Sequence, residues 1–132
     1  MCPVYINRIA SIHAESRNEK PYFSAQEPDY KEMITNANLR RRMSRMIKMG
    51  VACGLECLKD IPSEKVDAII TATGLGCLAD TEKFMNALMD NREQMLNPTA
   101  FIQSTFNTVG AQLALLLKIH AYNVTYVHRD RK

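Results

Sequence analysis

The 132-residue chain contains no tryptophan, and only 7% of its residues are aromatic. A stacking platform for nucleic-acid bases is built from aromatic side chains, so we expect none here. The formal net charge of +3 is also too small to indicate nucleic acid as a partner. The length allows at most one domain, and 46% hydrophobic with 23% charged residues is an ordinary globular composition.

Long apolar runs are absent as well. The opening stretch "MCPVYINRIASIHAES" has no basic region followed by a long apolar run, as a signal peptide would require. No stretch of about 18 uninterrupted apolar residues is present, so we expect no membrane-spanning segment and no membrane partner. The sequence therefore predicts a cytoplasmic protein whose four cysteines are reduced: Cys2, Cys53, Cys57 and Cys77.

What the chain does contain is an alternation of β-rich runs and helical patterns. The runs predict strands over residues 4–12, 66–73 and 123–128. Helical spacing predicts helices over residues 38–60, capped by Asn38, over 80–91, capped by Asp80, and over 105–121. Residues 15–36 and 97–104 are expected to be loops, the first with a turn of helix. Such an order indicates an α/β fold with a mainly parallel or mixed sheet.

The predicted elements do not bury one another well. The run 66–73 suits a strand covered on both faces, and the helix at 105–121 is apolar enough to need cover on most sides. Three strands would leave two long open edges. We therefore expect residues 1–132 to be an incomplete domain, or one that depends on a partner.

Glycines between a predicted strand and a predicted helix raise the question of a phosphate site. Gly74, Gly76 and Ala79 fit the dinucleotide pattern G-x-G-x-x-A in "TATGLGCLADTEKF". Two acidic residues, Asp80 and Glu82, lie where the pyrophosphate would bind. No acidic residue ends a second strand about 20 residues later, as the pattern requires. A tight turn of small residues is the favoured interpretation, and a nucleotide-binding domain is the remote alternative.

The cysteines and methionines are interpreted as core residues. Cys53 and Cys57 lie one helical turn apart, but no histidine stands at ligand spacing to them and zinc takes four ligands, so we expect no metal site. Cys77 is the one cysteine worth testing for reactivity, although the sequence places no base beside it. Most methionines are expected to fill the core: Met33, Met43, Met46, Met49, Met85, Met89 and Met95.

Basic residues cluster at the start of the helix predicted over 38–60: Arg40, Arg41, Arg42, Arg45 and Lys48. This is the unfavourable end of a helix for positive charge. A solvated face is one interpretation. The other is a docking patch for an acidic partner, carried by Arg41, Arg42 and Arg45.

Three segments together resemble β-ketoacyl synthases. "RRRMSRMIKMGVACGLECL" is similar to a helix near the start of that family, which opens with Arg-Met-x-Arg. "DAIITATGLGCLADTEKF" resembles the strand and glycine-rich turn that follow, commonly Gly-Ser-Gly-Ile-Gly-Gly-Leu. "NPTAFIQSTFNTVGAQLALLLKIHAYNVTYV" resembles the next segment, which runs through an Asn and an Ala-Gly helix to a strand. The order and spacing match over about residues 3–128, and look closest to divergent synthase-like proteins of bacterial polyketide or aryl-polyene pathways.

The resemblance implies a thiolase-type fold of two similar halves, of which this chain covers most of the first. It implies an acyl pocket bordered by the glycine turn (Gly74, Leu75 and Gly76), with Leu75 as an apolar gate. Phe106 and Asn107 would open a helix that lines the pocket and a dimer interface, and strand 123–128 would pair across that dimer. The expected partners are an acyl carrier protein and a second synthase-type subunit, in a homodimer or a heterodimer. No cofactor is expected.

The family reaction is a decarboxylative Claisen condensation, and it needs a cysteine just after the last strand. A helix N-terminus favours a thiolate at that position. By the resemblance the nucleophile falls at about Asp130, and "VHRDRK" contains no cysteine. The two family histidines belong to the second half. We therefore expect no catalytic residue in this chain, and an acyltransferase role only for a longer protein; a non-catalytic subunit like a chain-length factor is the alternative.

Overall fold

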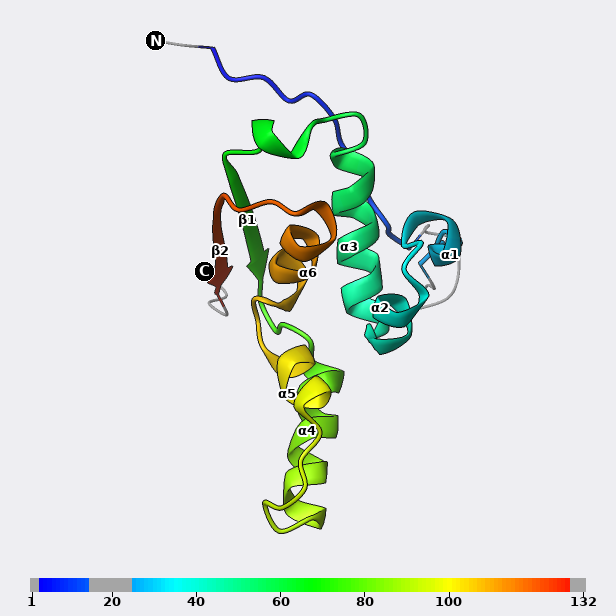
Figure 1. Ribbon diagram of the computed structural model, residues 1–132, viewed down its shortest axis with the longest axis vertical. Helices are drawn as coiled ribbons and strands as arrows, with labels where there is room; N and C mark the ends of the chain where they lie inside the picture. The colour runs from blue at the N-terminus through cyan, green and yellow to red at the C-terminus, as the bar shows by residue number, and fades with distance from the viewer. Residues whose placement is uncertain (1–2, 15–24, 129–132) are drawn as a thin grey trace, which may run out of the picture.

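The computed structural model describes residues 3–14 and 25–128. Three helices come first: α1 (Tyr30–Met33), α2 (Ala37–Arg42) and α3 (Arg45–Cys57). A 3-10 turn, η1 (Ser63–Lys65), leads into strand β1 (Ala68–Thr73). Helices α4 (Leu78–Asp90), α5 (Pro98–Ser104) and α6 (Thr108–Leu117) then precede strand β2 (Tyr122–Val127). Figure 1 shows α3 and α6 beside the strands, and α4 with α5 projecting as an arm from one end.

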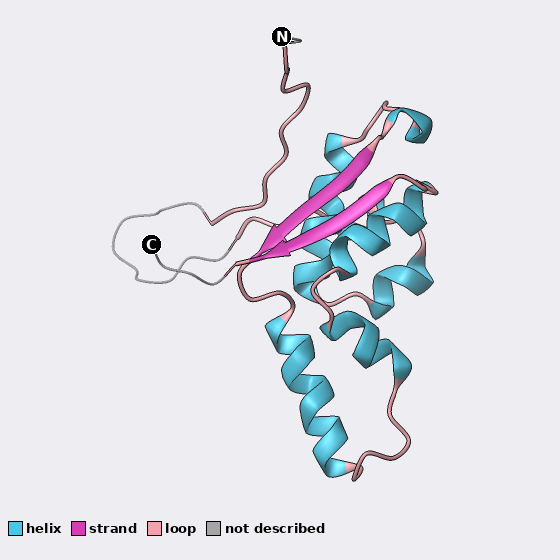
Figure 2. Cartoon of the chain, turned by 90° about the vertical axis from the view of Figure 1, so that its left-hand side faces the viewer, coloured by secondary structure: helices cyan, strands magenta, loops and turns pink. Residues whose placement is uncertain are grey.

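β1 and β2 form a parallel pair in register from Ala68 opposite Tyr122 to Thr73 opposite Val127. Parallel strands need a crossover connection, and here α4, α5 and α6 provide it. Figure 2 shows the two strands side by side with the helices packed on one face of the sheet. The predicted α/β class with a parallel sheet and helices is therefore confirmed.

The strand predicted over residues 4–12 is wrong for the described chain. This segment is extended and runs away from the body (Figure 1), and Val4 is 96% exposed. Arg8 holds it to the end of α3 by donating to the Glu56 and Lys59 carbonyl oxygens at 3.2 and 2.7 Å. Glu56 lies in the last turn of α3 and Lys59 follows the helix, so this contact is with the backbone and not with a strand. The β-rich sequence therefore has no sheet edge beside it, and propensity alone does not make a strand.

The core lies between α3, α6 and the inner face of β1. Ile47 and Val51 of α3 are fully buried, next to Leu113 of α6 and Ile69 of β1. Helical spacing in the sequence places Ile47 and Val51 on one apolar stripe, and in the structure this stripe faces the core. The two helices approach closely because α3 carries glycine at the contact: a Cβ added at Gly54 would lie 2.5 Å from Leu113 Cδ1.

The single helix predicted over residues 38–60 is wrong, because the chain breaks between α2 and α3. Asn36, not Asn38, caps α2, and its Oδ1 accepts from the Asn38 and Leu39 amides. Met43 then takes an extended conformation (φ −80°, ψ 133°) and enters the core, 5% exposed. Burial of this side chain outweighs the helix propensity of the surrounding sequence.

Two further predictions near the arm are wrong. Residues 97–104 form α5 instead of a loop: Asn97 Oδ1 accepts from the Thr99 amide, and Pro98 occupies the first helical position. Helix α4 begins at Leu78 with Cys77 as its N-cap, so Asp80 lies inside the first turn and is buried. The two helices are joined by Phe84 and Phe101, whose ring centroids are 5.5 Å apart.

The outer face of the sheet is bare in the described chain. Ile70 of β1 and Tyr126 of β2 are 65% and 61% exposed, so the expected burial of this strand on both faces does not occur here. Leu115 of α6 is also exposed to solvent, so one side of this helix is uncovered in the described chain. Among the methionines expected in the core, Met43 is buried and Met33 and Met49 are half-buried. The other four are exposed, namely Met46, Met85, Met89 and Met95.

None of the described helices is by itself long and apolar enough to cross a membrane. Taken together, α5 and α6 reach the length and composition of such a segment, but they are bent by 109° where they meet.

Candidate functional site

A mainly apolar cavity of about 420 Å³ lies where α3, β1 and α6 meet. Met46 and Met49 of α3 form one side, and Val109 and Leu113 of α6 form another. Residues of β1 line it as well, together with Gly76, Cys77 and Phe106 from the segments that flank α4 and α6. An apolar cavity with few polar groups is the usual form of a site for a small apolar ligand.

The glycine turn beside the cavity packs closely against the ring of Phe106. Gly76 has a φ of +62°, and a Cβ added there would lie 2.5 Å from Phe106 Cδ1. The Gly76 amide donates to Thr73 Oγ1 at 2.9 Å, at the end of β1. Position 76 therefore needs glycine for both its backbone conformation and its close contact with Phe106. The favoured interpretation of a tight turn of small residues agrees with this geometry.

Cys77 lines the cavity at the N-cap of α4 and is 6% exposed. Burial raises the pKa of its thiol above the ordinary value, and the neighbouring Asp80 carboxylate raises it further. A helix N-terminus alone would favour the thiolate, but desolvation and the carboxylate outweigh that effect. The Cys77 thiol is therefore protonated and uncharged at pH 7, and its side chain forms part of the cavity wall.

The polar groups of the cavity are already bonded within the sheet. The Thr71 and Thr125 hydroxyl oxygens are 2.6 Å apart across the strand pair, and Thr71 Oγ1 also donates to the Val124 carbonyl at 3.4 Å. Thr73 Oγ1 accepts from Gly76. A ligand entering this cavity would thus meet apolar walls and hydroxyls with existing partners, which suits an alkyl chain better than a charged group.

The structure brings together two of the five residues predicted to bind substrate. Gly76 and Phe106 line the cavity and touch each other. Gly74 and Leu75 lie exposed on the same turn, and Asn107 lies exposed at the N-cap of α6 without a side-chain cap bond. These three are outside the cavity lining among the described residues, and their role in binding stays a prediction.

Sequence reasoning missed Met46, Met49 and Leu113 as cavity residues. The methionines were assigned to the core, which is where flexible apolar side chains usually belong. A usable signal was present in Gly50 and Gly54, one turn apart on the same helix. Small residues at that spacing let another helix approach closely, and here Val109 and Leu113 of α6 pack against them beside the cavity.

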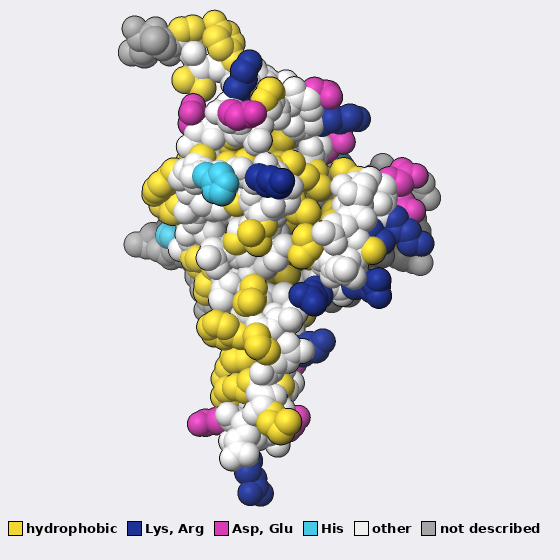
Figure 3. All heavy atoms as spheres, viewed as in Figure 1, with side chains coloured by type: hydrophobic (Ala, Val, Ile, Leu, Met, Phe, Trp, Pro, Cys, Tyr) yellow, Lys and Arg dark blue, Asp and Glu magenta, His cyan; other side chains and the backbone are white. Residues whose placement is uncertain are grey.

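The basic residues lie on the flank formed by α1, α2 and the start of α3 (Figure 3). Arg40, Arg41 and Arg42 occupy the last turn of α2, where the helix dipole favours positive charge. Their predicted position at the start of a helix was wrong because α2 ends before α3 begins. Arg41 and Arg42 are exposed, whereas Arg45 Nε lies 2.5 Å from Glu27 Oε1.

Glu27 is held as a carboxylate in this cluster. The hydrogen bond from the Tyr30 hydroxyl, at 2.7 Å, and then that from Arg45 lower the pKa of Glu27 below its ordinary value. The charge of Arg45 is therefore partly offset within the chain. Arg41 and Arg42 make no ion pair with a described residue, so they carry most of the accessible charge of the predicted docking patch.

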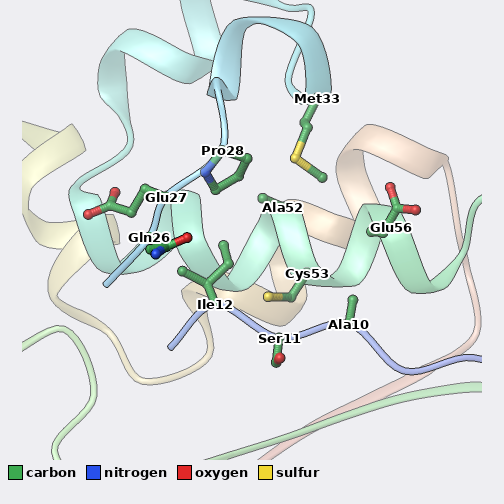
Figure 4. A pocket seen from close by; sticks show the side chains of 10 residues that line it. All are labelled: Ala10, Ser11, Ile12, Gln26, Glu27, Pro28, Met33, Ala52, Cys53 and Glu56. Carbon is green, nitrogen blue, oxygen red and sulfur yellow. The ribbon is translucent and has the colours of Figure 1, made fainter. Parts of the chain in front are cut away.

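A second, more open cleft of about 470 Å³ separates the N-terminal segment from α3 (Figure 4). Cys53 faces this cleft from α3, and burial raises the pKa of its thiol. Cys53, Cys57 and Cys77 are free thiols, and Cys2 lies outside the described residues. Within residues 3–14 and 25–128, no three His, Cys, Asp or Glu side chains gather as metal ligands would.

Comparison with protein families matches residues 13–125 to the model described as β-ketoacyl synthase, N-terminal domain. Among solved structures, the chain is similar to a complex of the ketosynthase ApeO with its chain length factor ApeC from Xenorhabdus doucetiae. The match has a TM-score of 0.60 and 23% sequence identity, and covers 80% of this chain. This chain spans 41% of the length of the matched chain. Comparison with curated proteins gave no significant match.

Proposed function

Because the chain belongs to the β-ketoacyl synthase family, as a divergent N-terminal domain with a thiolase-like fold, we propose that it shapes an acyl pocket in a chain-elongating assembly. The reaction of that assembly would be the decarboxylative condensation of fatty-acid or polyketide biosynthesis. One observation carries the proposal: the apolar cavity joins Gly76 and Phe106 to the side chains of α3 and α6. We further propose that residues 1–132 are one incomplete domain of a cytoplasmic protein.

The cavity walls match an alkyl chain in chemistry. Each buried methylene group contributes about 0.8 kcal/mol to binding, so a short acyl chain gains several kcal/mol from such walls. Met46 and Met49 are flexible enough to adjust to chains of different shape. The reacting thioester would lie outside this cavity, because burial and the neighbouring Asp80 carboxylate keep the Cys77 thiol protonated and so a poor nucleophile.

A heterodimer with a ketosynthase-type partner is the assembly we favour over a homodimer. The solved relative is a ketosynthase in complex with its chain length factor. The exposed apolar side chains of Ile70 and Tyr126 on the sheet, and of Met89 and Phe101 on the arm, provide surface that another subunit could cover. β2 leaves one edge free for strand pairing among the described residues.

The second candidate is a non-catalytic subunit of the chain-length-factor type. It is favoured by the sequence after β2, where residues 128–132 contain no cysteine. The position expected for the nucleophile, about Asp130, lies outside the described residues. Such a subunit would shape the pocket and hold the partner, while the partner would carry the acyl group.

An acyl carrier protein is the proposed third component, docking on Arg41, Arg42 and Arg45. Carrier proteins would bring negative charge to the exposed guanidinium groups of α2, and charge complementarity of this kind speeds association. Arg45 would contribute less than the other two because Glu27 already pairs with it.

The pocket is tested by titrating the full chain with N-acetylcysteamine thioesters of increasing acyl length. We expect affinity to rise with acyl length and then level off when the cavity is full. Met46→Trp would fill the cavity and weaken the longer thioesters about tenfold, the effect of losing roughly two buried methylene groups. Met89→Trp, an exposed position on α4 away from the cavity, is the matched control. Equal effects of both substitutions would contradict the acyl pocket.

The two candidate roles are separated by covalent labelling. The chain and its co-purified partner are incubated with a radiolabelled acyl-carrier thioester and resolved by mass. A pocket-shaping subunit without a nucleophile leaves all covalent label on the partner. Acylation of this chain would overturn the chain-length-factor role and restore the catalytic one.

A further inference from the structure

A small pocket lined by basic side chains lies among α1, α2 and α3, and its chemistry contrasts with that of the apolar cavity. Its cavity volume is about 270 Å³, space for roughly nine water molecules at about 30 Å³ each. Pro28 and Asp29 precede α1, Tyr30 and Lys31 belong to α1, and Arg40 and Arg41 come from α2. Lys48 closes it from α3, so three helices contribute to one concave site.

Four cations and one carboxylate line this basic pocket. Lys31, Arg40, Arg41 and Lys48 form no ion pair with any described residue. The one carboxylate, Asp29, is engaged as the N-cap of α1, where its Oδ1 accepts from the Lys31 amide at 2.8 Å. Glu27 also attracts Lys48 electrostatically, but it is hydrogen-bonded to Tyr30 and Arg45.

The positions of these cations are partly fixed by the fold. Arg40 Nη1 donates to the Ile34 carbonyl, which restrains the guanidinium and leaves its other donors without a described partner. Arg40 and Lys48 are half-buried, so their charges are less well solvated than those of free side chains. Four like charges around one concavity repel one another, and a bound anion would offset that repulsion.

From this arrangement we propose that the basic pocket binds a compact phosphate group, either a free phosphate ion or the monoester of a small molecule. Arginine provides paired donors that match phosphate oxygens, and lysine adds point charge. The pocket has room for one tetrahedral dianion with part of its hydration. Tyr30 is the one aromatic residue in its described lining, and the Tyr30 hydroxyl donates to Glu27 and not into the pocket.

The proposal goes beyond the acyl pocket and is separable from it. The basic pocket and the apolar cavity share no lining residue. Arg41 belongs both to the basic pocket and to the proposed carrier-docking patch, so it is left unchanged in the test. Lys31 and Lys48 belong to the basic pocket alone.

The test is a calorimetric titration of the full chain with inorganic phosphate at constant ionic strength, with sodium chloride replacing phosphate in the reference. We expect saturable binding that Lys31→Gln combined with Lys48→Gln weakens at least about tenfold, since each lost charge-assisted hydrogen bond lowers affinity by roughly that factor. Lys65→Gln combined with Lys83→Gln removes the same charge elsewhere and should change affinity less than about twofold. Absence of saturable binding, or equal loss in both double variants, overturns the proposal.

A second titration, with glycerol 3-phosphate, separates the two sources of the phosphate. Tighter binding than that of inorganic phosphate assigns the monoester, and equal or weaker binding assigns the free ion. The Met46→Trp variant should bind phosphate like the unaltered chain, and the lysine double variant should bind acyl thioesters normally. A failed acyl pocket and a failed phosphate site are thus distinguishable in the same set of proteins.

Discussion

The ring of Phe106 occupies the space that a side chain at position 76 would need: a Cβ built on Gly76 lies 2.5 Å from Phe106 Cδ1 and 2.7 Å from its Cε1. This contact joins the turn after β1 to the segment before α6, which are separated by the whole arm of α4 and α5. It also forms one wall of the apolar cavity.

Gly76→Ala should lower the free energy of unfolding by about 2 kcal/mol or more. The left-handed conformation at φ +62° costs a residue with a Cβ about 1–2 kcal/mol, and the contact with Phe106 adds to it. Urea unfolding measures the change. Gly74→Ala is the matched control, because its Cβ would meet nothing closer than the His128 carbonyl at 3.5 Å.

The same pair can be tested by a double-mutant cycle. Phe106→Ala removes the obstructing ring, so Gly76→Ala should cost less in the Phe106→Ala background than in the unaltered chain. The remaining cost would be that of the backbone conformation. A cost that is equal in both backgrounds would show that the ring does not hold the turn.

Asn97→Ala should destabilise the arm by about 1 kcal/mol, because α5 would lose the hydrogen bond from the Thr99 amide to the Asn97 side chain. Hydrogen exchange of the α5 amides is the local measurement. Asn86→Ala serves as the control, because it removes an exposed side-chain amide of α4 that makes no capping hydrogen bond. Unchanged exchange in α5 after Asn97→Ala would argue against this cap.

Stability should fall as the pH rises above about 9, the ordinary pKa of a cysteine thiol. Burial raises the pKa of Cys77 in the folded chain, so the unfolded chain loses its proton at lower pH than the folded one. The stabilising effect is therefore complete below the unfolded pKa and is lost as the pH rises towards the folded value. Unfolding midpoints between pH 7 and 10.5 measure this trend.

Cys77→Ala identifies the thiol responsible for that trend. The variant should show a shallower fall in stability above pH 9. The remainder would come from Cys53 and, near pH 10, from Tyr30, because burial raises the pKa of both groups. Cys57→Ala is the comparison, since this residue lies on α3 away from the cavity lining. Identical pH profiles for Cys77→Ala and the unaltered chain would exclude Cys77 as the source.

Arg41→Glu combined with Arg42→Glu should weaken binding of an acidic carrier protein by tenfold or more at low salt. The reversed charges replace attraction with repulsion, and the loss should shrink as salt screens it. Lys65→Glu combined with Lys83→Glu makes the same change in net charge at a distance from α2. Surface plasmon resonance at two salt concentrations measures both. Equal losses would mean that overall charge, not this patch, governs docking.

The parts of the fold that depend on local periodicity could be predicted from the sequence. The strands over 66–73 and 123–128 and the buried stripe of Ile47 and Val51 follow from such patterns, and the structure contains them with small shifts at the ends. The break at Met43 could not be predicted in this way. It depends on a core position that becomes visible only when α3 is packed against its neighbours.

The cap at Asn97 was present in the sequence as Asn-Pro-Thr and was missed, because the short helix that follows has little apolar periodicity. The residues of the candidate site could likewise be predicted only in part. Gly76 and Phe106 were predicted through a family resemblance, and the structure shows them in contact. Met46 and Met49 were not, since cavity-lining and core methionines have the same sequence pattern and differ only in what lies opposite them.

The pairing of β1 with β2 has a consequence for how the chain folds. Thr71 and Thr125, which share a hydrogen bond across the sheet, are 54 residues apart, whereas α4 and α5 associate through neighbouring sequence. Contacts between distant residues must overcome the entropy of closing a long loop, so they form late. The arm can thus fold while the rest of the chain is still being synthesised, and the strands can join only after residue 127 has left the ribosome.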